Sequence, residues 1–471
     1  MISKLKEVNL GYKYRIYPTA KQKELINYYG FIYNQTYNIC YNIWKKEQEY
    51  NKDKDKQDKI FRSKTKYDKI VKRILRFRKL EFKTVVTQQA RMNFFDAITH
   101  AFSKEVKIER AKAIAEAVTP KEKAKALQFG FPKYKKSTDI QKSFTWNNQA
   151  TSIIPHKRNN YRYLKLVGNH FKLRYHRELP EDYKLNSLVI SIDSSGKYFA
   201  SFNIKFNKLS QQLTNNKQEL LRKSVGIDMN VNNFSYSSLD ISKLIDNQSK
   251  SRRNIKASKR FKIKERKQSR RVLVSKKSKT KISKNHKRNQ IRMNKIHSKL
   301  KNQQNDLYHK LSKLLTNQFE MIVIEDLKTK NMSKSSKGNS VVPGKKVRQK
   351  SGLNRSILSA SFFEFTRQLT YKQTLLNDKL LIKVNPHYTS QLCSKCAING
   401  IEFKDKDNRK TQSKFKCINC GFTTNADLNA SNNILFRGLT GYGYKFEDFN
   451  KIIGTGNVLA LNKAKPFAIE H

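Results

Sequence analysis

Acidic residues are scarce in this chain. Its 471 residues hold 37 Asp and Glu against 99 Lys and Arg, which gives a formal net charge of +62 and an isoelectric point near 10.1. A surface with this excess repels itself unless a polyanion neutralises it, so the composition predicts a nucleic acid partner. An AT-rich genome would inflate the lysine content, but that bias does not account for so few acids.

Long apolar runs are also missing. No stretch of about 18 apolar residues occurs, which excludes a membrane-spanning helix. The opening residues, MISKLKE, lack the apolar core of a signal peptide. Hydrophobic residues make up only 37% of the chain, but 27 Phe and 22 Tyr supply enough bulk for a core. We expect about two to four domains or subdomains from the length, and a cytoplasmic protein associated with the nucleoid.

Cysteine occurs five times, and four of the five form two C-x-x-C pairs. Cys393 and Cys396 make the first pair, and Cys417 and Cys420 follow after twenty intervening residues. Two such pairs can place four thiolates around one Zn²⁺, which predicts a closed, structural zinc site rather than four unrelated buried cysteines. Cys40 is left over and is expected to be a small core residue; thiols that bind zinc suit a reducing cytoplasm.

The spacing of apolar residues changes twice within the first 206 residues, from strand-like to helical and back to strand-like. Residues 7–17 alternate like a half-buried strand, and residues 19–126 read as a helical subdomain with basic faces. Beyond it the period becomes two, and residues 161–175 and 188–206 each predict a β-hairpin. Together with strand 7–17, the hairpins could close a small barrel that the helical subdomain interrupts.

Two basic segments are candidate nucleic acid contacts. Residues 129–136 interleave aromatics with lysines, which suits base stacking, although a turn pinned by aromatic packing explains them equally well. Residues 251–300 hold 21 Lys and Arg and a single acid, Glu265. Such a block is often a disordered tail. Because strand-like segments flank it and apolar residues recur at near-helical spacing, we expect long helices with a basic outer face that binds phosphates.

Three carboxylates lie at the ends of predicted elements. Asp228 closes a short apolar strand, Glu325 ends the apolar run 321–325, and Asp427 follows the last cysteine by seven residues. Each acid alone is more often structural than catalytic. If the three converge at one edge of a sheet, they can bind two Mg²⁺ ions, which hydrolyse phosphodiesters.

The remaining C-terminal segments have simpler predictions. Residues 328–351 are rich in Lys, Ser and Gly and predict a mobile loop beside Glu325, a candidate lid. Residues 362–376 predict a core helix, and 380–384 a strand that leads to the first cysteine pair. A short helix is expected to end at Arg437, and the tail 438–471 is expected to be loosely ordered.

Several of these segments resemble those of TnpB, the family of transposon-encoded OrfB-like proteins that are similar to compact type V CRISPR effectors. The resemblance covers residues 10–437 and excludes the tail. The segments that carry it occur in family order: YKYRIYPTAKQK (12–23), GFPKYK (130–135), VGID (225–228), VIEDLK (323–328), FEFTRQLTYK (363–372), the two C-x-x-C pairs and DLNASNNIL (427–435).

The resemblance implies an α/β fold in which an RNase H-like RuvC nuclease domain accompanies an N-terminal β-barrel, a helical lobe that interrupts the barrel, and an inserted zinc ribbon. The implied domains are the barrel (1–18 and 127–218), the helical recognition lobe (19–126), the RuvC domain (219–390 and 422–437), the zinc ribbon (391–421) and the tail (438–471).

The resemblance also implies RNA-guided cleavage of double-stranded DNA beside a short transposon-associated motif. Asp228, Glu325 and Asp427 become the three RuvC acids that bind catalytic Mg²⁺, and the four cysteines bind Zn²⁺. The chain departs from the family pattern at Met229-Asn230, in the turn after the first acid, and at Asn425. An unguided DNA nuclease or transposase-type enzyme and a non-catalytic nucleic acid-binding regulator are the alternatives; a regulator would tolerate loss of the acids.

Overall fold

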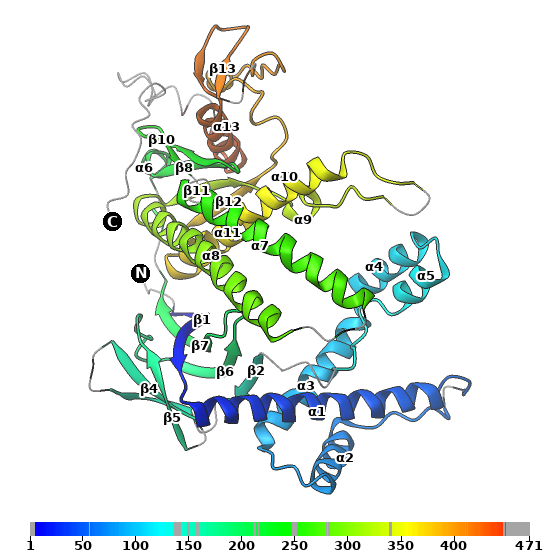
Figure 1. The fold of residues 1–471 in the computed structure, drawn as a ribbon. Helices are drawn as coiled ribbons and strands as arrows, with labels where there is room; N and C mark the ends of the chain where they lie inside the picture. Colours follow the sequence, from blue (N-terminus) through cyan, green and yellow to red (C-terminus); the bar gives the residue numbers. More distant parts are fainter. Residues whose placement is uncertain are drawn as a thin grey trace. The chain divides into compact units, whose positions relative to one another are not determined.

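The computed structural model describes residues 5–55, 57–135, 143–147, 151–156, 158, 160–166, 168–210, 213–214, 216–246, 252–278, 280, 283–338, 342–409, 411, 413–445 and 448 (Figure 1). The chain divides into two compact units, an N-terminal unit built from Glu7–Lys208 and a C-terminal unit built from Leu209–Gly338 and the residues from Val342 onward. Each is described by itself. In the described part of the chain, no helix has the length and apolar character that a membrane crossing requires.

Five helices form the helical part of the N-terminal unit: α1 (Ala20–Tyr50), α2 (Lys64–Phe77), α3 (Thr84–Ala101), α4 (Lys104–Ala115) and α5 (Pro120–Leu127). Thr19 starts α1 with a capping box, in which its side chain and that of Gln22 each accept a hydrogen bond from the other's backbone N–H. The region 19–126, predicted to be helical, thus contains several separate helices, and Ser103 and Thr119 each cap the start of a new one.

Aromatic packing holds this helical part together, and it includes one of the basic segments that the sequence singled out. The ring of Phe131 lies 5.5 Å from that of Phe102 and 6.0 Å from that of Trp44, with the Arg110 guanidinium stacked 4.1 Å from its centroid. The backbone of Lys135 exchanges two hydrogen bonds of 2.8 Å with the Asn38 amide. Of the two interpretations of residues 129–136, the structure therefore favours a turn pinned by aromatic packing.

The strands of the N-terminal unit form one sheet in the order β2-β6-β7-β1-β5-β4-β3. Their bounds are β1 (Leu5–Tyr17), β2 (Ser143–Asn147), β3 (Thr151–Pro155), β4 (Tyr161–Leu166), β5 (Asn169–Arg174), β6 (Lys184–Ile192) and β7 (Tyr198–Leu209). Both predicted hairpins are confirmed, since β4 pairs with β5 and β6 with β7 in antiparallel register. In the described residues the edge strands β2 and β3 do not pair with each other. The structure therefore shows a seven-stranded sheet, and closure of this sheet into a barrel stays a prediction.

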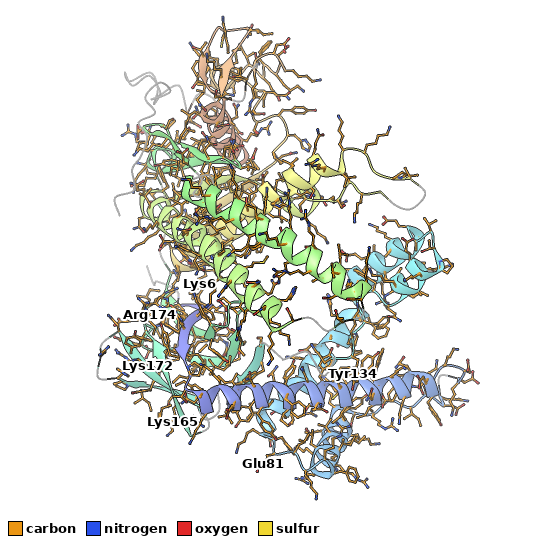
Figure 2. The ribbon with its side chains drawn as sticks, in the orientation of Figure 1. Lys6, Glu81, Tyr134, Lys165, Lys172 and Arg174 are labelled. Atoms are coloured by element: carbon orange, nitrogen blue, oxygen red, sulfur yellow. The ribbon has the colours of Figure 1, made fainter. Side chains whose placement is uncertain are left out.

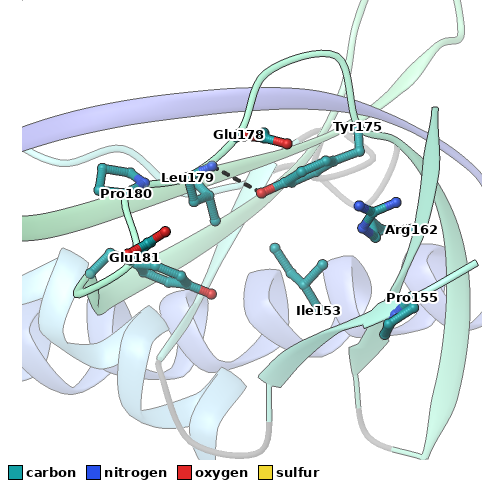
Figure 3. Close-up of a pocket in the computed structure, with 9 residues that line it drawn as sticks. Ile153, Pro155, Arg162, Tyr175, Glu178, Leu179, Pro180 and Glu181 are labelled. Carbon is teal, nitrogen blue, oxygen red and sulfur yellow. Dashed lines mark hydrogen bonds between the residues drawn. The ribbon is translucent and has the colours of Figure 1, made fainter. Parts of the chain in front are cut away.

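A cavity of about 330 Å³ opens on this unit beside β4 and β5 (Figure 3). The Tyr175 side chain lines the cavity, and its hydroxyl oxygen accepts a hydrogen bond of 2.9 Å from the backbone N–H of Leu179. The Arg162 guanidinium stacks 5.0 Å from the Tyr175 ring. Glu178 and Glu181 also line the cavity, so it has acidic side chains in a strongly basic protein.

The C-terminal unit contains a five-stranded sheet in the order β10-β9-β8-β11-β12. The strands are β8 (Ser224–Met229), β9 (Asn233–Ser237), β10 (Ser242–Asp246), β11 (Met321–Glu325) and β12 (Leu380–Val384). The first three form an antiparallel meander, and β11 lies parallel between β8 and β12. The strands predicted around Asp228 and Glu325 are thus confirmed.

Helices cover this sheet on both faces. The helices of this unit are α6 (Lys217–Arg222), α7 (Arg252–Lys277), α8 (Lys284–Gln318), α9 (Thr329–Met332), α10 (Val347–Ala360), α11 (Phe362–Thr370), the π-helix η2 (Tyr371–Leu376), α12 (Ser394–Ile398) and α13 (Ala426–Gly441). The basic block predicted to be helical forms α7 and the first half of α8. A small two-stranded sheet, β13 (Lys414–Lys416) and β14 (Thr423–Asn425), completes the unit.

Two local predictions need correction. The segment 328–351, predicted as a loop, carries α9 and the first turn of α10. The helix expected to end at Arg437 begins at Ala426 and continues to Gly441, because its Leu439 still packs into the core under the sheet. Residues 446–447 and 449–471 of the predicted tail lie outside the described residues.

The core lies on both sides of the five-stranded sheet. On one face, the rings of Phe234 and Tyr308 each lie 5.2 Å from that of Phe365, which joins the sheet to α8 and α11. On the other face, α13 approaches the sheet closely because Gly226 has no side chain: a Cβ there would collide with the backbone of Ser431 and Leu435. This close approach fixes where the first residues of α13 lie.

Candidate active site and metal centre

Asp228 is the most enclosed of the three acids. It belongs to β8, in which all six residues are buried, and its side chain is 7% exposed. The Asn230 amide nitrogen donates a hydrogen bond of 2.7 Å to Asp228 Oδ2. The strand therefore delivers a carboxylate into the interior, where only a polar partner or a cation makes its charge tolerable.

Glu325 lies beside Asp228 because of strand register. β11 pairs in parallel with β8 up to Ile324 opposite Ile227, so the two acids follow one step later on neighbouring strands. Glu325 is 8% exposed, and its Oε1 accepts a hydrogen bond of 2.8 Å from the Thr389 hydroxyl.

Asp427 enters from the first turn of α13. Asn425 caps this helix by accepting hydrogen bonds from the backbone N–H groups of Asp427 and Leu428. Two side-chain amides hold the Asp427 carboxylate. Asn230 donates a hydrogen bond of 3.0 Å to its Oδ1, and Asn233 donates one of 3.1 Å to its Oδ2. The departure from the family pattern at Asn425 thus supplies a helix cap and leaves the acid in place.

One amide therefore joins two of the acids, since the Asn230 nitrogen donates to both Asp228 and Asp427. Arg409 adds a positive charge, with its guanidinium nitrogen 3.5 Å from Asp427 Oδ1. The structure thus brings the three predicted acids together, and it adds Asn230 and Arg409, which sequence reasoning did not assign to the site.

The electrostatics of this cluster favour protonation. Burial raises the pKa of Asp228 well above its ordinary value, and the neighbouring Glu325 and Asp427 raise it further, while the Asn230 hydrogen bond and Arg409 oppose the shift. Burial also raises the pKa of Glu325, against the Thr389 hydrogen bond and the charge of Arg437. Crowded carboxylates of this kind suit divalent cations, because a bound cation restores the ionised form.

The four cysteines form a second, tighter cluster. Their Sγ atoms all lie within 4.8 Å of one another, with 3.6 Å between Cys393 and Cys420 and 3.8 Å between Cys396 and Cys417. Four sulfurs at the Zn–S distance of about 2.3 Å on a tetrahedron would be separated by roughly 3.8 Å. The donors and their spacing therefore fit Zn²⁺, and the predicted clustering of the cysteines is confirmed.

Both cysteine pairs have the same local geometry. The backbone N–H of Cys396 approaches Cys393 Sγ at 3.5 Å, and that of Cys420 approaches Cys417 Sγ at 3.5 Å. Burial raises the pKa of the Cys393 thiol, and the contact with the Cys396 backbone N–H opposes that shift. In the described residues, no other set of three or more His, Cys, Asp or Glu has its ligand atoms within 4.8 Å of one another. The three acids are thus arranged more loosely than the cysteines.

Asparagines of α13 tie the cysteine cluster to the acids. Asn429 accepts a hydrogen bond of 3.0 Å from the backbone N–H of Ser394, next to Cys393. Asn433 donates a hydrogen bond of 2.8 Å to the backbone carbonyl of Thr389, and the Thr389 hydroxyl in turn donates to Glu325. A single helix therefore carries Asp427, holds the loop that orients Glu325 and anchors the first cysteine pair.

Three family models match parts of the chain: "Helix-turn-helix domain" over residues 6–53, "Probable transposase" over 208–336 and "Cas12f1-like, TNB domain" over 362–434. The first two are OrfB models. Residues 6–53 hold β1 and α1 here, so a helix-turn-helix does not describe their structure. The third model covers the cysteine cluster and Asp427.

Curated relatives match shorter segments. The chain is 51% identical over 118 residues to InsQ of Escherichia coli, which is named as an RNA-guided DNA endonuclease; the match covers 25% of this chain and 28% of that protein. It is 38% identical over 81 residues to the CRISPR-associated endodeoxyribonuclease Cas12f1 of Sulfoacidibacillus thermotolerans, which covers 17% and 18%. A TnpB-like protein of Acanthamoeba polyphaga mimivirus is 33% identical over 129 residues, covering 27% and 22%.

A solved complex also aligns with the chain. The cryo-EM structure of a Cas12f1–sgRNA–target DNA complex covers 91% of this chain and 99% of its own at 15% identity, but its TM-score of 0.30 is too low to carry an argument. The matched segments span less than a third of the curated relatives. Within those segments, the family models and relatives confirm the resemblance to the TnpB (OrfB-like) family that the motifs indicated.

Proposed function

We propose that this protein is an RNA-guided DNA endonuclease of a transposon, which hydrolyses DNA phosphodiesters by a two-metal mechanism beside a short target-adjacent motif. The observation that carries the proposal is the cluster of Asp228, Glu325 and Asp427, three buried carboxylates on two neighbouring strands and one helix start. The names of InsQ and Cas12f1 support the same activity. The matched segments are short, so the activity of the whole protein is inferred.

The sheet order supports an RNase H-like, RuvC-type domain. Three antiparallel strands are followed by two parallel ones, with the first strand at the centre and a helix, α13, packed across β8. In this arrangement the carboxylates of β8 and β11 lie beside the start of α13. We assign the nuclease domain to this sheet and its helices, and the zinc ribbon to the cysteine cluster with β13 and β14.

The residues of the chain have distinct tasks in this mechanism. Asp228, Glu325 and Asp427 would hold two Mg²⁺ ions, which supply an activated water and charge stabilisation for the leaving oxygen. Thr389 keeps Glu325 oriented by its hydrogen bond, and Asn233 does the same for Asp427. Arg409, paired with Asp427 at 3.5 Å, is placed to attract a phosphate to the cluster.

Zinc would be bound by Cys393, Cys396, Cys417 and Cys420. Four thiolates close the coordination shell, so the metal holds structure and takes no part in the chemistry. Its task would be to fix the loop that reaches Thr389 and the segment that carries Arg409, both of which contact the acids.

A basic, aromatic sheet face in the N-terminal unit supports a guide RNA as partner. Lys165, Lys172 and Arg174 lie on β4 and β5 (Figure 2), and the Lys172 ammonium stacks 4.4 Å from the Tyr161 ring. Lysines on such a face meet phosphates while aromatic rings stack on bases. The basic helices α7 and α8 would follow the backbone of the RNA or of its heteroduplex with DNA.

The test compares guided with unguided cutting. The purified complex is treated with ribonuclease, and a guide RNA with a changed spacer is then added back. Cleavage should disappear and return at DNA that matches the new spacer, because base pairing reads the target. If the RNA-free protein still cuts its original site, the proposal is wrong and an unguided nuclease replaces it. If neither protein cuts DNA but both bind it, a non-catalytic regulator replaces it.

A further inference from the structure

The C-terminal unit contains a large cavity among α7, α8 and α10. Its volume is about 790 Å³, within the range of roughly 300–1,000 Å³ that is usual for ligand pockets. Phe261 lines it from α7, His297 and Gln304 from α8, and Asn354 and Arg355 from α10. Figure 1 shows α7 running beside α8, with which it is in contact. None of these residues belongs to the acid or cysteine clusters.

Helical spacing directs several side chains into this cavity. On α8, His297, Lys301 and Gln304 follow one another at intervals of four and three residues, so they share one face of the helix. On α7, Phe261 and Glu265 are four residues apart and also line the cavity. The cavity is therefore built from continuous faces of long helices rather than from a gap between loops.

Two amides in the cavity wall have unused hydrogen-bonding capacity. Gln304 is 5% exposed, and its amide lies close to the Tyr308 hydroxyl, which itself donates to the Ala360 carbonyl. Beyond that contact with Tyr308, neither the oxygen nor the nitrogen of the Gln304 amide has a hydrogen-bond partner. Asn354 uses its nitrogen to bond the carbonyl of Ser333, while its buried oxygen has no partner. Because buried polar groups in proteins are almost always hydrogen-bonded, these amides indicate a ligand with donors and acceptors.

Rings and positive charges flank the amides. The Phe261 and His297 rings lie with their centroids 6.2 Å apart, and Lys262, Lys301 and Arg355 line the same cavity. An apolar ligand would leave the amides and cations unmatched, and a bare phosphate would leave the rings unused. A ligand that combines a flat heteroaromatic ring with a phosphate matches all three kinds of group.

We propose that this cavity binds one unpaired nucleotide that is extruded from the bound nucleic acid. The base stacks on Phe261, its hydrogen-bonding edge meets the Gln304 and Asn354 amides, and its phosphate meets Arg355 and Lys301. The inference rests on the proposed function only for the source of the nucleotide, which is either the guide RNA or a single strand of the target DNA.

Photo-crosslinking tests the proposal and separates the two sources. The full protein is assembled with guide RNA and target DNA without Mg²⁺, once with 5-iodouridine in the RNA and once with 5-iodo-deoxyuridine in the DNA. After irradiation, mass spectrometry locates the labelled peptides. We expect labelling at or next to Phe261 or His297 in one arm, and that arm identifies the source.

Matched variants make the test specific. Phe261→Ala should lower the labelling of α7 and α8 by about tenfold or more, within the range expected for the loss of one base–aromatic stack. Ile263→Ala should leave it unchanged, because Ile263 is exposed on the same helix and does not line the cavity. Gln304→Leu, which removes the amide without emptying the space, should also lower labelling, whereas the exposed control Asn302→Leu should not.

The outcomes distinguish this inference from the proposed function. If the complex cuts RNA-matched DNA while neither arm labels these helices, the nucleotide site is wrong and the guided nuclease stands. If Phe261→Ala is labelled as strongly as Ile263→Ala, the site is also wrong. If the protein binds neither RNA nor DNA, both proposals fail together.

Discussion

The cysteine cluster and the carboxylate cluster of this protein are assembled to different degrees. The four Sγ atoms already lie within 4.8 Å of one another, at separations that a tetrahedral metal requires. The carboxylates of Asp228 and Asp427 are instead joined through the amide of Asn230, which donates to both. The cysteines are therefore already spaced for a metal ion, whereas the two carboxylates are bridged by an uncharged amide.

Protonation accounts for this difference. A thiol buried without metal is neutral and tolerates close neighbours, so four cysteines can be packed together in advance. Three buried carboxylates repel one another, and burial with like charge raises the pKa of Asp228. Strained electrostatics of this kind is typical of sites that act on a ligand, whereas a closed thiolate site stabilises structure. The comparison therefore predicts different responses to mutation.

The largest effect is expected from removal of an acid. Asp228→Asn, Glu325→Gln and Asp427→Asn should each lower Mg²⁺-dependent cleavage by about 10³-fold or more, since loss of a metal ligand removes several kcal/mol of transition-state stabilisation. DNA binding should persist, because affinity comes from basic side chains and base pairing. Cleavage assays and binding measured on the same preparations test this.

The control for the acids is Asp306→Asn, which changes an exposed acid paired with Lys310 on α8. It should cut at the parental rate. Any one of the three site variants that also cuts at the parental rate would lose its place in the catalytic set.

Removal of a zinc ligand should act through structure instead. Cys417→Ser should lower the zinc content from about one ion per chain and unfold the ribbon locally, because apparent binding energies of structural zinc reach about 10–16 kcal/mol in small modules. Cleavage should fall with it, since the ribbon supports Thr389 and Arg409. Metal analysis by mass spectrometry, with Cys40→Ala as control, tests the assignment; full zinc occupancy in Cys417→Ser contradicts it.

The sequence predicted the members of both clusters for different reasons. The cysteines could be found because their spacing alone is distinctive. The acids could be found because each ends an apolar strand or starts a helix, and strand ends meet at one edge of a sheet. The structure shows that the side chains of Asp228, Glu325 and Asp427 lie close together. Their catalytic role stays a prediction.

The supporting residues could not be found in the same way. Asn230 is next to a predicted acid, yet an asparagine after a strand is usual in turns, and its bond to Asp427 spans 197 residues of chain. Arg409 is one of 99 basic residues, so its type carries no information. Thr389 and Asn433 act only through three-dimensional contacts with Glu325 and with the loop beside it.

Removal of the Asp228 carboxylate should also affect folding stability. This effect is smaller than the effect on cleavage and has the opposite sign, because the variant should be more stable than the parent. Burial and two neighbouring acids raise the pKa of Asp228, so the folded protein holds this proton more tightly than the unfolded protein does. The stability that this group contributes therefore falls as pH rises from about 3.9, the unfolded value, through the raised folded value. At pH 7 without Mg²⁺, Asp228→Asn should be more stable than the parent by roughly 1–3 kcal/mol.

Thermal unfolding with and without Mg²⁺ measures this effect. Mg²⁺ should raise the unfolding temperature of the parent more than that of Asp228→Asn, because a cation that binds the folded state stabilises it. The same two proteins also distinguish the carboxylate cluster from the cysteine cluster, because Zn²⁺ chelation should destabilise the parent and Asp228→Asn alike. An acid variant less stable than the parent at pH 7 would mean that the carboxylate cluster is not under electrostatic strain.

The smallest effect is expected at the hydroxyl that orients Glu325. Thr389→Val keeps the shape of the side chain and removes the hydrogen bond of 2.8 Å to Glu325 Oε1. Because this bond lowers the pKa of Glu325 against the effect of burial, its loss should raise that pKa further. The acidic limb of the pH–rate profile should therefore move to higher pH, with a rate loss at neutral pH of roughly tenfold, as for the loss of one hydrogen bond to a charged group. Thr374→Val, which alters a hydroxyl bonded within its own helix, is the control and should leave the profile unchanged. A lower rate with an unshifted pH profile would show that Thr389 acts only by holding its loop, and not through the charge of Glu325.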